Sequence, residues 1–258
     1  MLAGMNPIVI KLGGSIITDK NVPFKVNDDL IDSMAKEMYA SNRVDLVLIH
    51  GGGSVGHYVA RKIGIEDNTP KKPEALSYLL LEMDKLTARI LSHLVENGIP
   101  SISLPTHSIA RIKSDDSIEL NLDTVRLTLT SGFVPLLKGD LVLSERGLHK
   151  IVSGDFLAAE ISRELSAEKL ILCIDQDGII GPDGNVIEEL SLKQPYQDLI
   201  WPDEIKRVDV TGGMNAKLEA LREVAQVGIP AYFLCPTRRG RLLNALTGKP
   251  FRGTKIVW

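Results

Sequence analysis

Apolar runs of strand length alternate with amphipathic stretches of helix length along nearly the whole chain. The apolar runs are almost uninterrupted, which is typical of parallel strands that are buried on both faces. This pattern predicts an α/β fold, a three-layer αβα sandwich around a mainly parallel open sheet. Strands are expected at Pro7 to Leu12, Val44 to Ile49, Ile99 to Leu104, Phe133 to Leu137, Lys169 to Ile174 and Ala231 to Leu234. Helices are expected at Asn27 to Ala40, Pro73 to Asn97, Gly154 to Leu165 and Met214 to Val227.

Local signals mark the ends of some of these elements. Gly98 and Gly228 each follow a predicted helix and stand two residues before a proline, as glycines that terminate helices often do. Two short apolar pieces between residues 141 and 151 flank a Ser-Glu-Arg-Gly turn and predict an antiparallel hairpin, and Asp183-Gly184 is a weaker hairpin signal. Because no flexible linker divides the chain, a boundary between two lobes is expected near Lys169.

Composition limits the classes of partner. The chain of 258 residues has 30 basic and 33 acidic residues and a formal charge of −3, so no overall positive field attracts nucleic acid or an anionic membrane. No apolar run reaches the roughly 18 residues of a membrane span, and no secretion signal is recognised at the N-terminus, which predicts a cytoplasmic protein. Cys173 and Cys235 lie in apolar strands and are expected to be buried, reduced thiols. Any bound anion must therefore be held by local groups.

Glycine turns at strand ends are the feature that supplies such groups. Ligands of open α/β sheets bind beyond the carboxyl ends of the strands, and glycine turns there let backbone N–H groups meet a phosphate. One such turn is weak evidence, but four in one chain, two of them close to a lysine, predict a polyphosphate ligand. The segments are Lys11-Leu12-Gly13-Gly14-Ser15, His50-Gly51-Gly52-Gly53-Ser54-Val55-Gly56-His57, Ser153-Gly154-Asp155 and Thr211-Gly212-Gly213-Met214 with Lys217 one turn later.

Common nucleotide-binding signatures do not fit these turns. Gly51, Gly53 and Gly56 match G-x-G-x-x-G, but a polar stretch with two prolines follows and no strand is predicted before Ile99. The context of a dinucleotide-binding unit is therefore missing. The sequence also contains no G-x-x-x-x-G-K-[ST] motif and no H-R-D or D-F-G signature of protein kinases.

The order of the motifs resembles that of the amino-acid kinase superfamily over nearly the whole chain. The matching segments are Lys11-Leu12-Gly13-Gly14-Ser15, the triple glycine after a strand, Gly139-Asp140, Ser153-Gly154-Asp155, Asp175-x-Asp177-Gly178 and Asp209-Val210-Thr211-Gly212-Gly213-Met214-x-x-Lys217. Within the superfamily the chain is most similar to the isopentenyl phosphate kinases, because of His57 in H-G-G-G-x-x-G-H and Lys20 nine residues after Lys11. Val55 departs from that pattern, which usually has Phe there.

The resemblance implies an acceptor-binding lobe (residues 1–166) and a nucleotide-binding lobe (167–258) on one continuous sheet. It implies an archaeal-type homodimer that uses ATP and Mg²⁺ to convert isopentenyl phosphate to isopentenyl diphosphate, in isoprenoid precursor synthesis by an alternative mevalonate pathway. The residues expected to act in catalysis are Lys11, Lys20, His57, Asp155 and Lys217. The acceptor phosphate is expected at Gly52, Gly56, His57 and Gly154. The nucleotide is expected at Lys11, Gly13, Gly14, Ser15, Gly53, Asp175, Gly178, Gly212 and Lys217.

The residue types agree with phosphoryl transfer to a phosphate. Such catalysis is positioning plus neutralisation of charge, and a phosphate monoester, with a second pKa of about 6, is already an anionic nucleophile. No general base is then needed, so Asp155 is interpreted as a group that orients the lysines. His57 is predicted to donate to the acceptor phosphate, the alternative being a local capping or packing role. No carboxylate cluster for Mg²⁺ is recognised, so the ion is expected to be held mainly by the phosphates.

Other polar residues receive structural interpretations. His50 is expected to brace the glycine turn, and a solvated loop position is the alternative for Lys20. The apolar stripe of the long helix is expected to be core or dimer contact, with Met83 or Tyr78 as a candidate for limiting acceptor chain length. Structural positions are expected for His93, His107 and His149. Turn and N-cap positions are expected for Asp19, Asp28 and Asp29. A solvated face is expected for Arg238, Arg239, Arg241, Lys249, Arg252 and Lys255.

Three other functions stay open at this level. A kinase of a phosphonate such as fosfomycin would share the glycine turns and His57, because its acceptor group is nearly the same. A kinase of an amino-acid carboxylate is disfavoured by His57. A non-catalytic nucleotide- or oxyanion-binding protein of the same fold is disfavoured by the joint presence of Lys11, Lys20 and Lys217.

Overall fold

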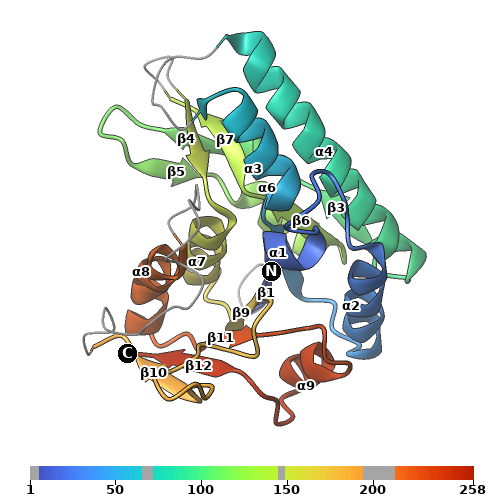
Figure 1. Cartoon of the computed structure of the whole chain (residues 1–258), viewed down its shortest axis with the longest axis vertical. Coiled ribbons are helices and arrows are strands. Elements are labelled where there is room, and N and C mark those ends of the chain that lie inside the picture. The colour runs from blue at the N-terminus through green and yellow to red at the C-terminus, as the bar shows by residue number, and fades with distance from the viewer. Residues whose placement is uncertain (1–5, 66–71, 145–148, 194–212) are drawn as a thin grey trace.

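An eight-stranded sheet with the order β10-β12-β11-β9-β1-β2-β6-β3 forms the centre of the molecule (Figure 1). The computed structural model describes residues 6–65, 72–144, 149–193 and 213–258. Every pair of neighbouring strands is parallel except β11 with β12, so the predicted mainly parallel sheet is confirmed. The strands are β1 (Ile8–Leu12), β2 (Leu46–His50), β3 (Ser101–Ser103), β6 (Val134–Lys138), β9 (Lys169–Cys173), β10 (Glu189–Ser191), β11 (Ala231–Leu234) and β12 (Thr254–Val257).

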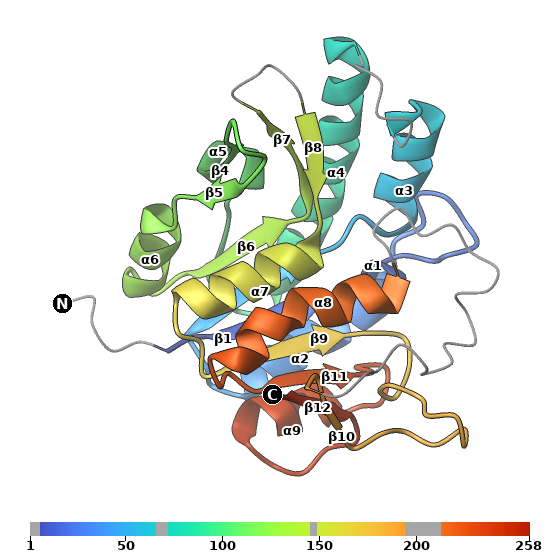
Figure 2. The same cartoon turned by 90° about the vertical axis from the view of Figure 1, so that its left-hand side faces the viewer.

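Helices cover both faces of this sheet. The helices α7 (Gly154–Glu164) and α8 (Gly213–Gln226) lie side by side on one face, with α6 (Asp123–Thr130) beyond α7 on the same face (Figure 2). The other face is covered by α2 (Asp28–Ala40), α4 (Pro73–Glu96) and α9 (Arg241–Thr247). Along β1, Val9 packs into the first core and Ile8 and Ile10 into the second, as the two-residue period of a strand requires. The predicted three-layer sandwich is thus confirmed.

Shorter elements lie at the carboxyl end of the sheet or beside it. They are α1 (Gly14–Ile17), α3 (Gly53–Lys62), α5 (Thr106–Ile109) and the antiparallel hairpins β4 (Ala110–Ile112) with β5 (Ile118–Leu120) and β7 (Asp140–Leu143) with β8 (His149–Val152). The strands of the second hairpin confirm the sequence prediction, although its turn at 145–148 lies outside the described residues. The first hairpin was not predicted, because its strands have only three residues each.

Two predicted helix ends and one predicted turn have the expected backbone. Gly98 follows α4 with φ +83° and Gly228 follows α8 with φ +80°, a left-handed conformation that glycine adopts without strain. Gly184, with φ +81°, lies in the turn closed by the bridge between Ile180 and Val186. In the described ranges, none of the helices has the length and apolar character needed to cross a membrane.

Candidate active site

Backbone hydrogen bonds join the carboxyl ends of four neighbouring strands. Gly13 N, just after β1, donates to Cys173 O at the end of β9 over 3.0 Å. Gly51 N, just after β2, donates to the carbonyl of the last residue of β1 over 3.0 Å. Gly139 N, just after β6, donates to His50 O at the end of β2 over 2.9 Å. The turns after β1, β2 and β6 therefore share one edge of the sheet, where ligands of open α/β sheets bind.

Two of the predicted glycine turns are packed back to back. A Cβ on Gly14 would lie 2.5 Å from Gly53 N, and a Cβ on Gly53 would lie 2.1 Å from Thr18 Oγ1. Gly53 also has φ +52°, which other residues rarely adopt. The Thr18 hydroxyl donates to Gly14 O (2.8 Å) and accepts from Ser54 N (2.8 Å). Thr18 thus joins the two turns, a role that no sequence motif indicated.

The third glycine turn lies against the same edge. A Cβ on Gly154 would lie 3.2 Å from His50 O, and one on Gly139 would lie 2.8 Å from Gly154 N. The helix α7 begins at this turn, where Ser153 Oγ accepts a hydrogen bond from the backbone of the first turn over 3.1 Å. Of the fourth predicted turn, Gly212 lies outside the described residues, and α8 begins at Gly213.

Two lysines from distant parts of the chain converge on Asp155 in the first turn of α7. Lys11 Nζ, on β1, lies 2.8 Å from Asp155 Oδ1, and Lys217 Nζ, on α8, lies 3.5 Å from Asp155 Oδ2. Burial alone would raise the pKa of the Asp155 carboxyl, but the two ammonium groups outweigh it and lower this pKa. An ionised carboxylate between two lysines is not suited to take up a proton, and its position is consistent with a group that orients them.

Lys20 lies near the carboxyl end of β9, the strand next to β1. It lies on the loop after α1, and its ammonium group pairs with the carboxylate of Asp175, two residues beyond β9. The two side chains are 37% and 39% exposed. Lys20 is therefore an exposed loop lysine with a partner 155 residues away at the sheet edge, and its role in catalysis stays a prediction.

The turn expected to hold the acceptor contacts α3 and α4. His57 lies four residues after Gly53 on α3 and is half-buried. On α4, Met83 is buried, and its Sδ lies 3.4 Å from a Cβ built on Gly52 and 3.1 Å from one built on Gly56. Met83 thus borders the predicted acceptor turn, whereas Tyr78 is exposed and its ring lies under the Lys62 ammonium group at 5.9 Å.

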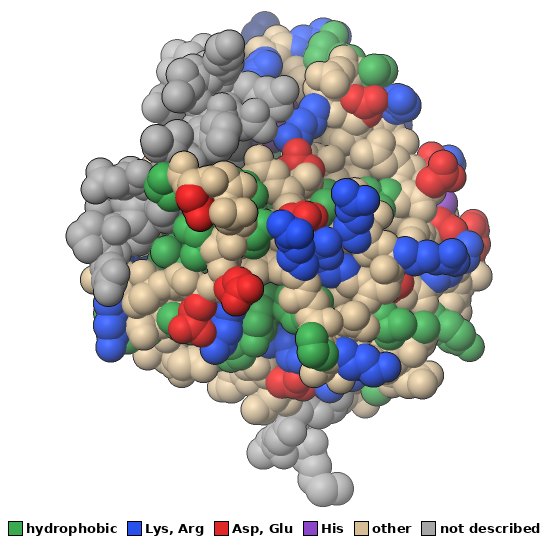
Figure 3. Space-filling model, turned by 60° about the horizontal axis from the view of Figure 1, so that its bottom comes forward, with side chains coloured by type: hydrophobic (Ala, Val, Ile, Leu, Met, Phe, Trp, Pro, Cys, Tyr) green, Lys and Arg blue, Asp and Glu red, His purple; other side chains and the backbone are tan. Residues whose placement is uncertain are grey.

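One predicted nucleotide contact, Gly178, has another structural reason. A Cβ on Gly178 would lie 2.7 Å from both Thr254 Oγ1 and Val186 Cγ1, so close packing by itself requires a glycine there. Its neighbour Asp177 forms ion pairs with Arg241 (Nη1 to Oδ1, 2.6 Å) and with Arg252 (Nε to Oδ2, 3.5 Å). Arg241 is only 11% exposed, so the prediction of a solvated position is wrong for it. Figure 3, in which the bottom of the molecule in Figure 1 comes forward, shows a group of Lys and Arg side chains with acidic side chains beside them.

Some residues that received structural interpretations make unpredicted contacts. Asp28 does not cap α2; its Oδ1 instead accepts from Arg89 Nε at 2.6 Å and lies 2.9 Å from His93 Nε2, which ties α2 to α4. The Arg89 and His93 side chains lower the pKa of Asp28 to about 2, against the opposing effect of burial. Asp19 is a turn residue as predicted, since its Oδ1 accepts from Asn21 N at 2.9 Å.

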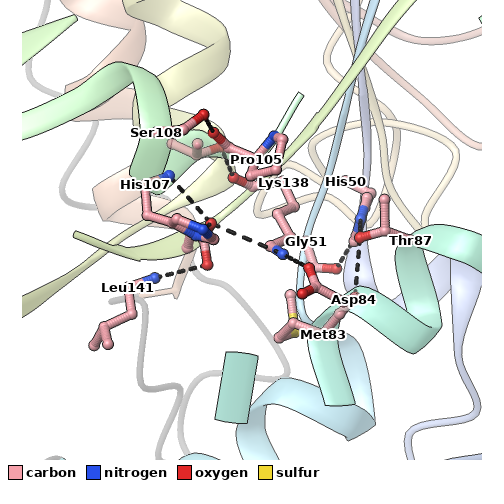
Figure 4. Close-up of polar contacts among 12 residues, drawn as sticks. His50, Gly51, Met83, Asp84, Thr87, Pro105, His107, Ser108, Lys138 and Leu141 are labelled. Atoms are coloured by element: carbon pink, nitrogen blue, oxygen red, sulfur yellow. Dashed lines mark hydrogen bonds and ion pairs between the residues drawn. The ribbon is translucent and has the colours of Figure 1, made fainter. Parts of the chain in front are cut away.

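His50 braces the glycine turn as predicted, and a buried lysine lies next to it. Its Nδ1 lies 2.9 Å from Gly51 O and its Nε2 lies 2.9 Å from Thr87 Oγ1 on α4 (Figure 4). Burial, with further contributions from Lys138 and Lys11, lowers the pKa of His50 to about 4, so the ring is neutral near pH 7. Lys138 was missed because it directly follows the predicted strand Phe133 to Leu137. A lysine at the end of such an apolar run is nevertheless a sequence signal.

The described residues form no protein cage for a metal ion. Within those ranges no three or more His, Cys, Asp and Glu side chains lie together as metal ligands would. The carboxylate nearest to Lys11 and Lys217 is already engaged by both lysines. A dedicated Mg²⁺ site built from protein carboxylates therefore does not fit this part of the chain.

Comparisons with known proteins agree with this geometry. The profile of the amino acid kinase family matches residues 6–235. The chain is 30% identical to an isopentenyl phosphate kinase of Methanothermobacter thermautotrophicus, covering 97% of this chain and 98% of that protein, and 32% identical to one of Haloferax volcanii, covering 90% and 92%. A solved isopentenyl phosphate kinase superimposes with a TM-score of 0.82 at 26% identity, over 96% of this chain and 99% of the other. The chain therefore belongs to the amino acid kinase family and is a phosphotransferase.

Proposed function

We propose that this protein transfers the γ-phosphoryl group of ATP to isopentenyl phosphate and forms isopentenyl diphosphate. The observation that carries the proposal is the convergence of Lys11 and Lys217 on Asp155, at the strand edge where the glycine turns pack together. Two cations there match the charge of a phosphoryl group in transfer. The choice of acceptor is supported by the isopentenyl phosphate kinases among the similar proteins and by His57 beside the turn after β2.

In this proposal the two substrates meet over the end of β1. Lys11 and Lys217 bind the phosphates of ATP and stabilise the negative charge of the phosphoryl group during its transfer. Lys20, which lies beside Asp175, neutralises negative charge in the transition state. The backbone of the turn at Gly52 and the ring of His57 hold the acceptor phosphate. That phosphate is itself the nucleophile, so no protein group removes a proton. Mg²⁺ enters only as the ion that accompanies ATP, and no protein ligand is assigned to it.

The remaining expectations form part of the same proposal. Residues 1–166 would bind the acceptor and residues 167–258 the nucleotide, which Gly13, Gly14, Ser15 and Gly53 of the first lobe would also contact. A homodimer, a cytoplasmic location and a place in isoprenoid precursor synthesis remain predictions.

A coupled assay of ADP release tests the proposal. The purified protein is given ATP and Mg²⁺ with isopentenyl phosphate, dimethylallyl phosphate, fosfomycin or glutamate. The expected result is the highest kcat/KM with isopentenyl phosphate. A preference for fosfomycin or glutamate would replace the proposed acceptor, and ADP release with none of the acceptors would favour a binding protein of this fold.

A further inference from the structure

Two residues that face each other on neighbouring strands both reach the same helix. His50 ends β2 and Lys138 ends β6, and they are register partners in the sheet. His50 Nε2 lies 2.9 Å from Thr87 Oγ1, and the Lys138 ammonium group forms an ion pair with Asp84 (Figure 4). Asp84 and Thr87 are three residues apart and lie on one side of α4, so the sheet holds this helix at two adjacent points.

The Lys138 ammonium group is buried and therefore needs a negatively charged partner. The Lys138 side chain is 2% exposed, whereas Asp84 is 55% exposed, so the helix supplies the carboxylate from its solvent side. A second carboxylate, Asp140, has its Oδ2 3.9 Å from Lys138 Nζ and 2.8 Å from His107 Nδ1. Because Lys138 is buried, loss of Asp84 would leave its ammonium group with only the more distant Asp140, so this pair is expected to hold its geometry more firmly than a pair between two exposed side chains.

The ion pair lies where α4 changes its packing partner. In the C-terminal half of the helix, Leu86 and Ile90 belong to the main core beneath the sheet. In the N-terminal half, Leu79 and Met83 belong to a separate small cluster with Val59 of α3. The N-terminal half of α4 and the helix that carries His57 thus pack on each other, and Lys138 ties α4 to the sheet at the junction.

The same junction adjoins the acceptor turn. Thr87 Oγ1 donates to Met83 O at 2.9 Å, and Met83 Sδ packs against Gly52 and Gly56. Gly139, the residue after Lys138, donates its N–H to His50 O. A shift of α4 relative to β6 would therefore move Met83 against the turn that holds the acceptor.

We propose that the ion pair between the buried Lys138 and the exposed Asp84 is a positioning element that sets acceptor affinity by fixing α4 against the acceptor turn. The inference rests on the proposed phosphotransfer but not on the identity of the acceptor. Because Lys11, Asp155 and Lys217 lie on β1, α7 and α8 respectively, outside this contact, loss of the pair is expected to act on the acceptor and to leave ATP binding unchanged.

Steady-state kinetics with variants Asp84→Asn and Lys138→Met test the inference. Each is expected to raise KM for the acceptor about tenfold or more and to change KM for ATP less than twofold, because small displacements of a bound substrate have large effects. Asp84→Glu keeps the charge and is expected to retain an acceptor KM close to that of the wild type. The matched control is Lys85→Met, which removes the exposed pair of Lys85 with Glu82 (2.7 Å) on the same helix.

The outcomes separate this inference from the proposed function. The wild type is assayed first, and if it prefers another acceptor, the variants are compared with that acceptor. Asp84 occupies a solvent-exposed helix position, so Asp84→Asn is expected to fold and can be assayed even if Lys138→Met does not fold. An acceptor KM in Asp84→Asn equal to that of Lys85→Met, or equal increases of KM for both substrates, would overturn the positioning role.

Discussion

The ammonium group of Lys11 lies 2.8 Å from the carboxylate of Asp155, and both side chains are almost completely buried. Because this carboxylate also holds Lys217, the variant Asp155→Asn leaves two cations with no anion between them. The free energy of unfolding is expected to fall by about 3 kcal/mol, as for other buried pairs that lose one partner. Urea unfolding of the ligand-free protein measures this loss.

Bound ATP should restore part of the stability of Asp155→Asn, since its phosphates supply the missing negative charge. The increase of Tm on adding ATP is expected to be larger for this variant than for the wild type. Glu160→Gln is a suitable control on the same helix, because it removes the Arg163 pair (2.8 Å) away from the site. Equal increases of Tm for the wild type and Asp155→Asn would argue against ATP binding at these lysines.

Lys20→Met is expected to reduce kcat about 100-fold, the usual loss when one group that stabilises transition-state charge is removed. Its half-exposed pair with Asp175 should contribute less than about 1 kcal/mol to folding, so Tm is expected to stay close to that of the wild type. Lys25→Met, which breaks the Asp19 pair (3.1 Å) on the same loop, is the control. If kcat were retained in Lys20→Met, this lysine would have only the structural role of pairing with Asp175.

His57→Gln is expected to lower kcat/KM for isopentenyl phosphate roughly 10- to 100-fold, the range for losing a hydrogen bond to a charged group. KM for ATP should change little. The neighbouring Tyr58→Phe, an exposed ring that contacts Phe24, serves as the control. Unchanged acceptor kinetics in His57→Gln would assign this histidine a local packing role.

Gly53→Ala is expected to be poorly tolerated, because its Cβ would overlap Thr18 Oγ1 at 2.1 Å in a backbone with φ +52°. Gly184→Ala makes a clean comparison, since that glycine has φ +81° with no neighbouring atom within 4 Å of a Cβ. The control should lose only the roughly 1 kcal/mol of the left-handed conformation. Circular dichroism melts of both variants test this difference, and equal decreases of Tm would contradict the tight packing of the two turns.

His50 should make stability depend on pH. Its pKa is about 4 in the folded protein and near 6.5 when unfolded, so between these values the unfolded chain binds the proton and the folded protein does not. The contribution of His50 to stability is therefore complete above pH 6.5 and is lost as the pH falls towards 4, by about 3 kcal/mol in total. Urea midpoints of wild type and His50→Gln at pH 7 and pH 5 measure it. Equal pH dependence of the two proteins would contradict a buried neutral ring.

The sheet and its main helices followed from the sequence because their signals are local. Buried parallel strands such as β1 and β9 read as unbroken apolar runs, and Gly98 and Gly228 mark helix ends. The edge strand β10 and its neighbour β12 escaped prediction, since they are short and only partly buried. The site was predictable as far as its glycine turns and lysines, because these follow predicted strands or open predicted helices.

Contacts between distant residues could not be predicted in the same way. Lys20 and Asp175 are 155 positions apart, and Asp84 lies on the polar side of a helix 54 positions before Lys138. Nothing in either local sequence indicates its partner, because the pairing depends on strand order and helix placement. The unpredicted role of Thr18 has the same origin, since its hydroxyl joins two turns that only the folded sheet brings together.

The hydrogen bonds from Gly13, Gly51 and Gly139 to neighbouring strand ends limit how the shape of this site could adapt to a different acceptor. They join the ends of β9, β1, β2 and β6 into one hydrogen-bonded backbone edge, so widening one of these turns would break a hydrogen bond to the neighbouring strand. Under the proposed function, a longer or bulkier acceptor would be accommodated by side chains and tilt of the outer helices α3 and α4 rather than by this backbone edge. Because α3 also carries His57 and Met83 of α4 borders the acceptor turn, a change in acceptor size would be coupled to the binding of the acceptor phosphate.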